Sequence, residues 1–183
     1  MKIEATPLPG VLVVKLDSRT DQRGSITRVF CENELGEVLG ERRVVQSNHS
    51  RTAKVGTVRG MHFQYPPYAE MKLITCLHGS IRDVAVDLRA GSPTFLQWFA
   101  IELNGDNQHL FIIPEGCAHG FQVLQPESEL LYFHTAPYTP EAEGGVRPDD
   151  PKLNIVWTLP ISEVSPRDQM HQLIDREFTG VIA

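Results

Sequence analysis

The chain has 183 residues, of which 41% are hydrophobic and 22% charged, and its formal net charge is −6. This length and composition are ordinary for a globular protein, and we expect a single domain over residues 1–183. The acidic balance argues against nucleic acid as a partner, because phosphate binding usually requires a basic surface.

The chain shows no sign of export or membrane insertion. No apolar run approaches the roughly 18 residues of a membrane span, and the first residues lack the apolar run of a signal peptide. Cys31, Cys76 and Cys117 form no CxxC motif, which favours reduced thiols. We therefore expect a cytoplasmic protein with no membrane partner.

Short apolar runs rich in Val, Ile and Phe alternate with turn residues along most of the chain. The runs are 11–16, 73–77, 81–88, 98–103, 110–113 and 130–133. This spacing predicts an all-β sandwich or barrel. Asn104-Gly105 predicts a hairpin turn, because both residues tolerate positive φ.

Helical signals are sparse. Residues 32–39 predict one short helix and residues 165–178 another. Ser165 with Asp168 three residues later resembles a helix cap, and Pro166 stands at the first helical position. Residues 137–151 are polar and hold four prolines, which predicts a long loop.

Arg59 and His62 lie close together in a chain of mostly apolar strands. In a regular strand they would point to opposite faces, so a bulge or turn at Gly60 would be needed to aim both into one pocket. A lone histidine is also typical of a surface or hydrogen-bonded core position, and both interpretations stay open.

Lys72 and Tyr132 each allow two interpretations as well. An inward lysine in a barrel requires an anion or a developing negative charge, whereas a lysine on an edge strand protects against aggregation. A strand tyrosine usually packs in the core, but its phenol can also act as a general acid.

Residues 113–121 contain the pattern Pro114-x-Gly116-x-x-His119, which is typical of cupin barrels. Cupins often use this histidine as a metal ligand together with an upstream His-x-His unit. Here that unit reads His62-Phe63-Gln64, so one imidazole is missing and we expect no catalytic metal. No glycine-rich phosphate loop is present, so we expect no bound NAD or ATP and no other cofactor.

Together these segments resemble the dTDP-4-dehydrorhamnose 3,5-epimerase family over roughly residues 8–170. The segments that carry the resemblance are 21–24, 46–50, 59–64, 72–73, 79–89, 92–95, 113–116, 118–121 and Tyr132. Their joint order and spacing is far more specific than any single piece.

The resemblance implies an all-β cupin jelly-roll barrel with short peripheral helices, which forms a homodimer and needs no metal. It implies that His62 is the general base, Asp168 its partner, Tyr132 the acid and Lys72 the group that stabilises an enolate. The implied substrate-binding positions are Arg23, Arg28, Gln46, Ser47, Asn48, Arg59, His119, Pro137, Glu143 and Arg167.

These residue types suit the implied reaction on a nucleotide-linked 4-keto-6-deoxy hexose. The C4 ketone acidifies the hydrogens on C3 and C5, and removal of one gives an enolate that Lys72 can stabilise. Reprotonation from the other face inverts the carbon, so one base and one acid suffice. The expected function is epimerisation at C3, C5 or both in deoxysugar biosynthesis of the rhamnose type.

The sequence also departs from the family pattern. Arg28 stands where members often have a glutamate near the nucleotide, and Pro137 where some have a tyrosine stacked on thymine. A 3-only or 5-only epimerase acting on another nucleotide sugar therefore remains an alternative. A metal-dependent cupin and a non-catalytic sugar-binding module are more distant alternatives.

Two structural expectations follow. His62 and Asp168 should form a hydrogen-bonded pair, because a histidine base needs a partner that fixes its tautomer. The strand at residues 11–16 would be an exposed apolar edge in a monomer, which favours pairing between two copies.

Overall fold

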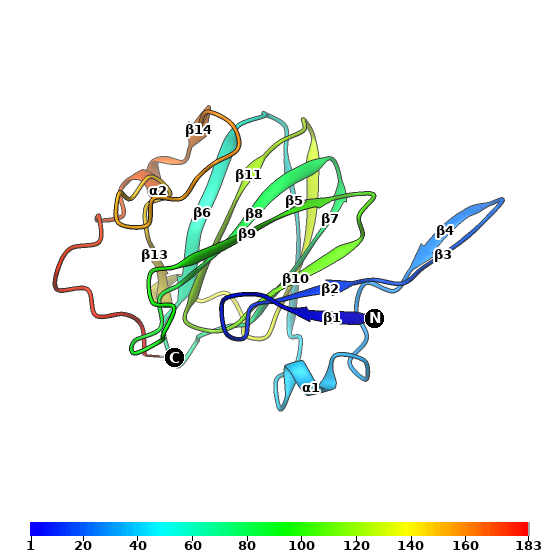
Figure 1. The fold of residues 1–183 in the computed structure, drawn as a ribbon, viewed down its shortest axis with the longest axis horizontal. Coiled ribbons are helices and arrows are strands. Elements are labelled where there is room, and N and C mark those ends of the chain that lie inside the picture. Colours follow the sequence, from blue (N-terminus) through cyan, green and yellow to red (C-terminus); the bar gives the residue numbers. More distant parts are fainter. Residues whose placement is uncertain (183) are drawn as a thin grey trace.

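The computed structural model describes residues 1–182, and the last residue of the expected 1–183 domain lies outside the described part. All but two of the strands belong to two facing β-sheets (Figure 1). The first sheet has the order β1 (Lys2–Ala5), β2 (Leu12–Lys15), β10 (His109–Ile113), β7 (Lys72–His78), β12 (Ser128–His134) and β5 (Gln46–Thr52). The second has the order β13 (Glu143–Gly145), β6 (Thr57–Gln64), β11 (Cys117–Val123), β8 (Ser80–Asp87) and β9 (Trp98–Asn104), with β14 (Glu163–Val164) also paired to β6.

Consecutive strands mostly lie in opposite sheets. The chain crosses between the sheets from β5 to β6, from β7 to β8, from β9 to β10 and from β11 to β12. This connectivity makes the sandwich a jelly roll, as the family resemblance implied. The predicted hairpin at Asn104-Gly105 is wrong, because that turn joins β9 to β10 in the other sheet.

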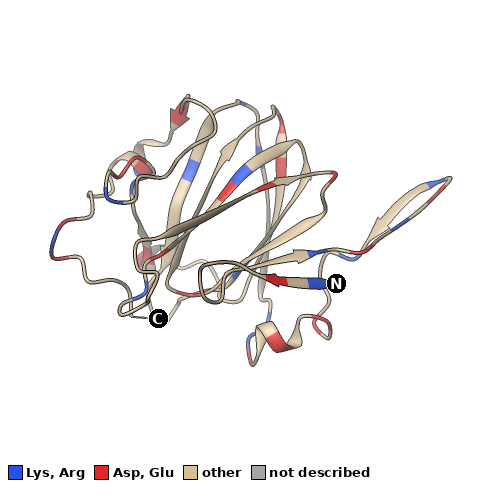
Figure 2. Cartoon of the chain, viewed as in Figure 1, with Lys and Arg blue, Asp and Glu red and all other residues tan. Residues whose placement is uncertain are grey.

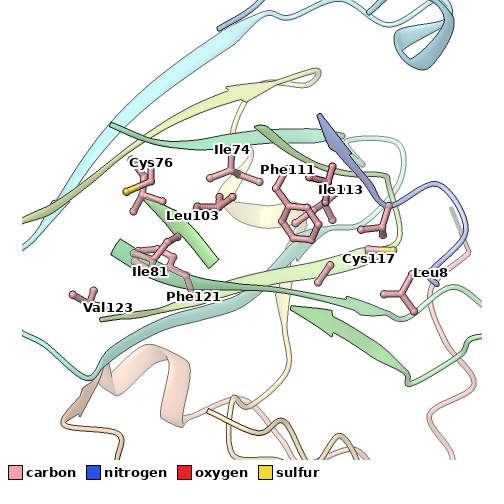
Figure 3. Close-up of a cluster of buried hydrophobic side chains, with 14 residues drawn as sticks. Leu8, Ile74, Cys76, Ile81, Leu103, Phe111, Ile113, Cys117, Phe121 and Val123 are labelled. Atoms are coloured by element: carbon pink, nitrogen blue, oxygen red, sulfur yellow. The ribbon is translucent and has the colours of Figure 1, made fainter. Parts of the chain in front are cut away.

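The core lies between the two sheets and is built from inward-facing residues of both. Ile74 and Phe111 of the first sheet meet Ile81, Leu103 and Phe121 of the second (Figure 3). Each of these side chains is at most 3% exposed. Their burial removes apolar surface from water, which is the main favourable term in folding.

Both sheets are also covered on their outer faces. On the first sheet, Leu35, which directly precedes α1 (Gly36–Leu39), and Leu39, its last residue, pack on Leu73 and Leu110. On the second, Leu153 and the C-terminal segment pack on outward residues of β6 and β8. A strand that is buried on both faces has apolar residues at consecutive positions. The mostly apolar runs at 73–77 and 81–88 belong to such strands.

The helices are shorter than predicted. The first predicted helix, over 32–39, is reduced to Gly36–Leu39, and the second, over 165–178, to α2 (Pro166–Gln169). The cap of α2 is confirmed, because the Ser165 hydroxyl accepts a hydrogen bond from the backbone N–H of Asp168. The predicted loop at 137–151 contains a 3-10 turn (Pro140–Ala142) and β13. Among residues 1–182, no helix combines the length and apolar character needed to cross a bilayer.

The N-terminal region corrects one expectation. The strand within residues 11–16 is β2, and β1 pairs with it on the side away from β10, so β2 is not the edge. The edge strand β1 carries Lys2 and Glu4, which are charged. The argument for a dimer from an exposed apolar edge at 11–16 is therefore wrong. The hairpin of β3 (Ser18–Asp21) and β4 (Gly24–Thr27) extends away from the two sheets (Figure 1).

Candidate active site

A polar cavity of about 570 Å³ opens at one end of the space between the sheets. Its lining comes mainly from β5, β6, β7, β11 and β12 and from the segment around β13. The lining residues are Ser47, Asn48, His49, Ser50, Arg59, His62, Glu70, Lys72, His119, Phe121, Tyr132, His134, Tyr138, Glu143 and Arg167. The cavity is where the apolar core gives way to polar side chains.

The change from apolar to polar follows the alternation of the strands. On β7 the inward residues Cys76 and Ile74 belong to the core, and Lys72, two residues further, faces the cavity. On β12 the same step leads from Leu130 to Tyr132. Because side chains on one face recur every second residue, these strands carry core at one end and site at the other.

Arg59 and His62 both line the cavity because β6 carries an extra residue between them. His62 pairs with His119 on β11 and Arg59 pairs with Phe121, so three steps on β6 match two on β11. Gly60 in this bulge has φ +115°, and an added Cβ would lie 2.6 Å from the carbonyl oxygen of His119. The predicted irregularity at Gly60 is confirmed.

The predicted pair of His62 and Asp168 is also confirmed. Nε2 of His62 lies 2.7 Å from Oδ1 of Asp168, and the backbone N–H of Gly60 donates to Oδ2 over 3.2 Å. Burial alone would raise the pKa of Asp168, but the hydrogen bonds from His62 and Gly60 hold it below its usual value. An ionised carboxylate only accepts, so Nε2 of His62 carries a proton and Nδ1 is the basic nitrogen.

Lys72 is buried on a central strand, because β7 lies between β10 and β12. The edge-strand interpretation of Lys72 is therefore wrong. Its ammonium donates to the carbonyl oxygen of His62 over 3.0 Å and lies 3.2 Å from Oε1 of Glu70. The other oxygen of Glu70 is 2.7 Å from Nδ1 of His134. Burial would raise the pKa of Glu70, but His134 and Lys72 together hold it below its usual value.

Tyr132 faces the cavity between two histidine rings. Its ring lies edge-on to His119 with centroids 5.9 Å apart, and stacks on His134 at the same separation. Burial, together with the charge of Asp83, raises the pKa of Tyr132 far above its ordinary value, so the phenol stays protonated at neutral pH. Asp83 is fully buried on β8 and is hydrogen-bonded to Nε2 of His119.

The structure gathers most but not all of the predicted binding residues. Ser47, Asn48, Arg59, His119, Glu143 and Arg167 line the cavity. Gln46 and Pro137 are not among its lining residues but bond to neighbours of them: the Gln46 amide oxygen accepts from the backbone N–H of Tyr138, and the Pro137 carbonyl accepts from Gln64.

Arg23 and Arg28 are outside this cavity. Arg23 is at the turn of the β3–β4 hairpin, 85% exposed and paired with Asp21. Arg28 follows the hairpin and pairs with Glu34. Within residues 1–182 the cavity therefore receives no side chain from the hairpin.

Several residues at the site were not identified from the sequence. Tyr138 follows Pro137 directly, and its hydroxyl donates to Glu143 over 3.0 Å. His134 and Glu70 stand two residues from Tyr132 and Lys72, so the period of a strand could have indicated them. The role of Asp83 as partner of His119 depends on packing between strands, and no local signal reveals it.

Two sets of residues bear on metal binding. At the cupin ligand positions, the Gln64 amide donates to the carbonyls of Tyr68 and Pro137 and accepts from the backbone N–H of Thr139. Nε2 of His119 is hydrogen-bonded to Asp83. These positions do not converge as ligands. Elsewhere, His62, Asp168 and His171 each place one donor atom within 4.8 Å of the others.

The jelly roll is of the cupin type, and its cavity has the pair of His62 and Asp168 on one wall and the protonated phenol of Tyr132 on the other. The profile of the dTDP-4-dehydrorhamnose 3,5-epimerase family matches residues 5–176. The chain belongs to this family, and it is an epimerase of the isomerase class.

Individual relatives agree with the family. A dTDP-4-dehydrorhamnose 3,5-epimerase of Sinorhizobium fredii is 38% identical over 157 residues, which cover 86% of this chain and 80% of the relative. A dTDP-4-dehydrorhamnose 3-epimerase of Streptomyces niveus is 35% identical and covers 92% of this chain and 82% of its own. The crystal structure of a dTDP-6-deoxy-D-glucose-3,5-epimerase from Legionella pneumophila, in complex with dTDP-4-keto-L-rhamnose, has a TM-score of 0.91. It is 37% identical and covers 100% of this chain and 98% of that one.

Proposed function

We propose that this chain inverts both C3 and C5 of a dTDP-linked 4-keto-6-deoxy hexose in deoxysugar biosynthesis. The observation that carries the proposal is the placement of a base and an acid on opposite walls of one cavity. His62 comes from β6 in the second sheet, and Tyr132 from β12 in the first. Inversion requires this arrangement, because the proton leaves one face of the carbon and returns to the other.

His62 is proposed to remove the proton. Asp168 accepts the Nε2 proton, which leaves the Nδ1 lone pair as the base and stabilises the imidazolium that forms. The Arg167 guanidinium lies 3.4 Å from Nε2 of His62, and its salt bridge to Glu143 holds it at the cavity mouth. Nε2 of His62 already donates to Asp168, so Arg167 adds no hydrogen bond to the ring, and Asp168 fixes its tautomer before substrate arrives.

Lys72 is proposed to stabilise the enolate, and Tyr132 to return the proton. Among the described residues, Lys72 is the one lysine or arginine that the first sheet contributes to the cavity, and Glu70 and the His62 carbonyl hold its buried ammonium in place. A fixed charge in a water-poor site stabilises developing negative charge without reorganisation. The phenol of Tyr132 remains protonated at neutral pH and is therefore available as a donor.

Arg59 and Arg167 are proposed to bind the diphosphate. They line this cavity and a second hollow beside it, which they share with His62 and Lys54. Guanidinium groups suit phosphate oxygens because they donate in pairs. The half-exposed ring of Tyr138 offers a flat surface for the base of the nucleotide, in place of Pro137 beside it.

A deuterium-exchange assay tests the function. The protein is incubated in D2O with dTDP-4-keto-6-deoxyglucose, and with the UDP and GDP analogues, and NMR follows deuterium at C3 and C5. We expect uptake and inversion at both carbons with the dTDP sugar. Uptake at C3 alone would support the 3-only alternative, and the Streptomyces niveus relative is named as such a 3-epimerase. His62→Ala should abolish uptake and His78→Ala, on the exposed far end of β7, should not; uptake by His62→Ala would contradict the proposal.

We further propose a homodimer in which the β3–β4 hairpin of one copy reaches the cavity of the other. The hairpin projects from the body, and its Ile26 is 73% exposed (Figures 1 and 2). The proposal places Arg23 and Arg28 near a substrate that neither can reach within its own chain. Light scattering should give a dimer at micromolar concentration, and Arg23→Ala should raise KM with little change in kcat. A monomer with normal KM would overturn it.

Residues 1–183 are proposed to act as one catalytic domain, because the residues that line the site come from elements between β5 and α2. A cytoplasmic location is supported by three cysteines that are all free, two of them buried.

A further inference from the structure

His171 is the one member of the His62–Asp168–His171 group that the proposed mechanism does not use. It lies beyond α2, and its ring meets the ring of His62 edge-on, with centroids 6.2 Å apart. Its Nε2 is buried and has no hydrogen-bond partner. A buried polar atom without a partner is uncommon and calls for a ligand or another explanation.

Gly145 makes room for this ring. In the pairing of β13 with β6, Gly145 stands directly opposite His62, so a side chain there would share the face of His62. A Cβ on Gly145 would lie 2.3 Å from Nε2 of His171. The histidine therefore occupies the space of a missing side chain, next to the base and its carboxylate.

We propose that His62, Asp168 and His171 form a binding site for Zn²⁺, and that the bound ion switches the enzyme off. Two imidazoles and a carboxylate are a common zinc ligand set, with water as the fourth ligand. One donor atom from each residue already lies within 4.8 Å of the other two. The inhibition, but not the binding, rests on the proposed function.

Metal binding requires only a small change at the pair. Zinc held at about 2.0–2.2 Å from each ligand separates neighbouring donor atoms by about 3.3 Å. Nε2 of His62 and Oδ1 of Asp168, now 2.7 Å apart, would therefore move apart by about half an ångström. The ion takes the place of the shared proton on Nε2, and that proton moves to Nδ1, so the imidazole stays neutral and no net proton is released. A metal-bound His62 has no free lone pair, because Nε2 holds the ion and Nδ1 carries the proton, so it cannot abstract a proton from substrate.

The surrounding charge sets a limit on affinity. Glu143 lies beside the group and adds negative charge, whereas the Arg167 guanidinium, 3.4 Å from Nε2 of His62, repels a cation. Arg167 is 54% exposed and can swing towards solvent. The site therefore suits an inhibitory ion that binds reversibly better than it suits a tightly bound cofactor.

The experiment titrates ZnCl2 into untagged, metal-free protein by calorimetry in two buffers of different ionisation enthalpy, without substrate. We expect one zinc per chain and the same binding enthalpy in both buffers, because the proton of His62 moves from Nε2 to Nδ1 and is not released. His171→Gln should weaken binding at least tenfold, and so should Gly145→Ala, whose methyl group displaces the ring. His78→Gln, on the exposed end of β7, is the matched control and should bind like the wild type.

Activity gives the second measurement. Zinc should inhibit deuterium uptake by the wild type and by His78→Gln, EDTA should reverse the inhibition, and His171→Gln should need at least tenfold more zinc. Absence of binding, or binding and inhibition that His171→Gln leaves unchanged, would overturn the proposal. If zinc binds through His171 but no nucleotide sugar is epimerised, the proposed function fails and the site stands.

Discussion

Asp168→Asn tests the base at the short hydrogen bond that joins His62 to α2. The carboxylate accepts two hydrogen bonds, from Nε2 of His62 and from the backbone N–H of Gly60. An amide has only one acceptor oxygen. If that oxygen faces Gly60, the NH2 group faces His62 and forces the wrong tautomer; if it faces His62, a donor faces the Gly60 N–H.

The size of the effect follows from this geometry. The Asp168 side chain is only 4% exposed, so water cannot replace the lost bond. A hydrogen bond to a charged group contributes about 1.5–3 kcal/mol. Because the charge of Asp168 also stabilises the imidazolium formed in the transition state, this loss should appear in kcat. We expect kcat to fall about 10- to 150-fold, with KM nearly unchanged.

The assay is NMR of inversion and deuterium uptake under saturating substrate. Asp150→Asn is the matched control, because Asp150 is also buried but bonds only the backbone N–H groups of Lys152 and Ile174. It should lower thermal stability and leave kcat within a few-fold of the wild type. Equal kcat for Asp168→Asn and wild type, or an equal fall for both variants, would refute the reasoning.

Three further predictions concern the acid, the metal and stability. Tyr132→Phe should keep deuterium uptake, because His62 still forms the enolate and exchanges with water, while inversion falls by about 10²-fold or more; normal inversion by NMR would make Tyr132 a packing residue. Treatment with EDTA should leave turnover intact, and a loss that zinc or iron restores would contradict the metal-free mechanism. The pKa of Asp87 is lowered to about 2 in the folded protein: burial alone would raise it, but hydrogen bonds from Arg89 and its neighbours outweigh that effect. Its stabilisation is therefore full above about pH 4 and is lost as the pH falls towards 2, which corresponds to about 2 kcal/mol; urea unfolding between these pH values should show this loss for wild type and not for Asp87→Asn.

Much of the fold was predictable because its signals are local. The apolar runs and their turns indicate short strands, and a strand's period of two explains why Lys72 faces the interior with Ile74. The helices were overestimated because residues 170–178 contain apolar residues without a regular face, and tertiary contacts hold them as an extended cover on the second sheet.

The sequence by itself determined which chemical groups the protein has and to which family its motifs belong. His62, Tyr132, Lys72 and Asp168 could all be named from the chain. Only the tertiary structure decided how they meet. The extra residue at Gly60 depends on the register with β11.

The tail brings Asp168 to a histidine 106 residues away, β1 removes the expected apolar edge, and the hairpin carries Arg23 away from the cavity of its own chain. Each of these outcomes depends on contacts between distant segments. Their free energy depends on packing and hydrogen-bond partners that a local stretch of sequence does not contain.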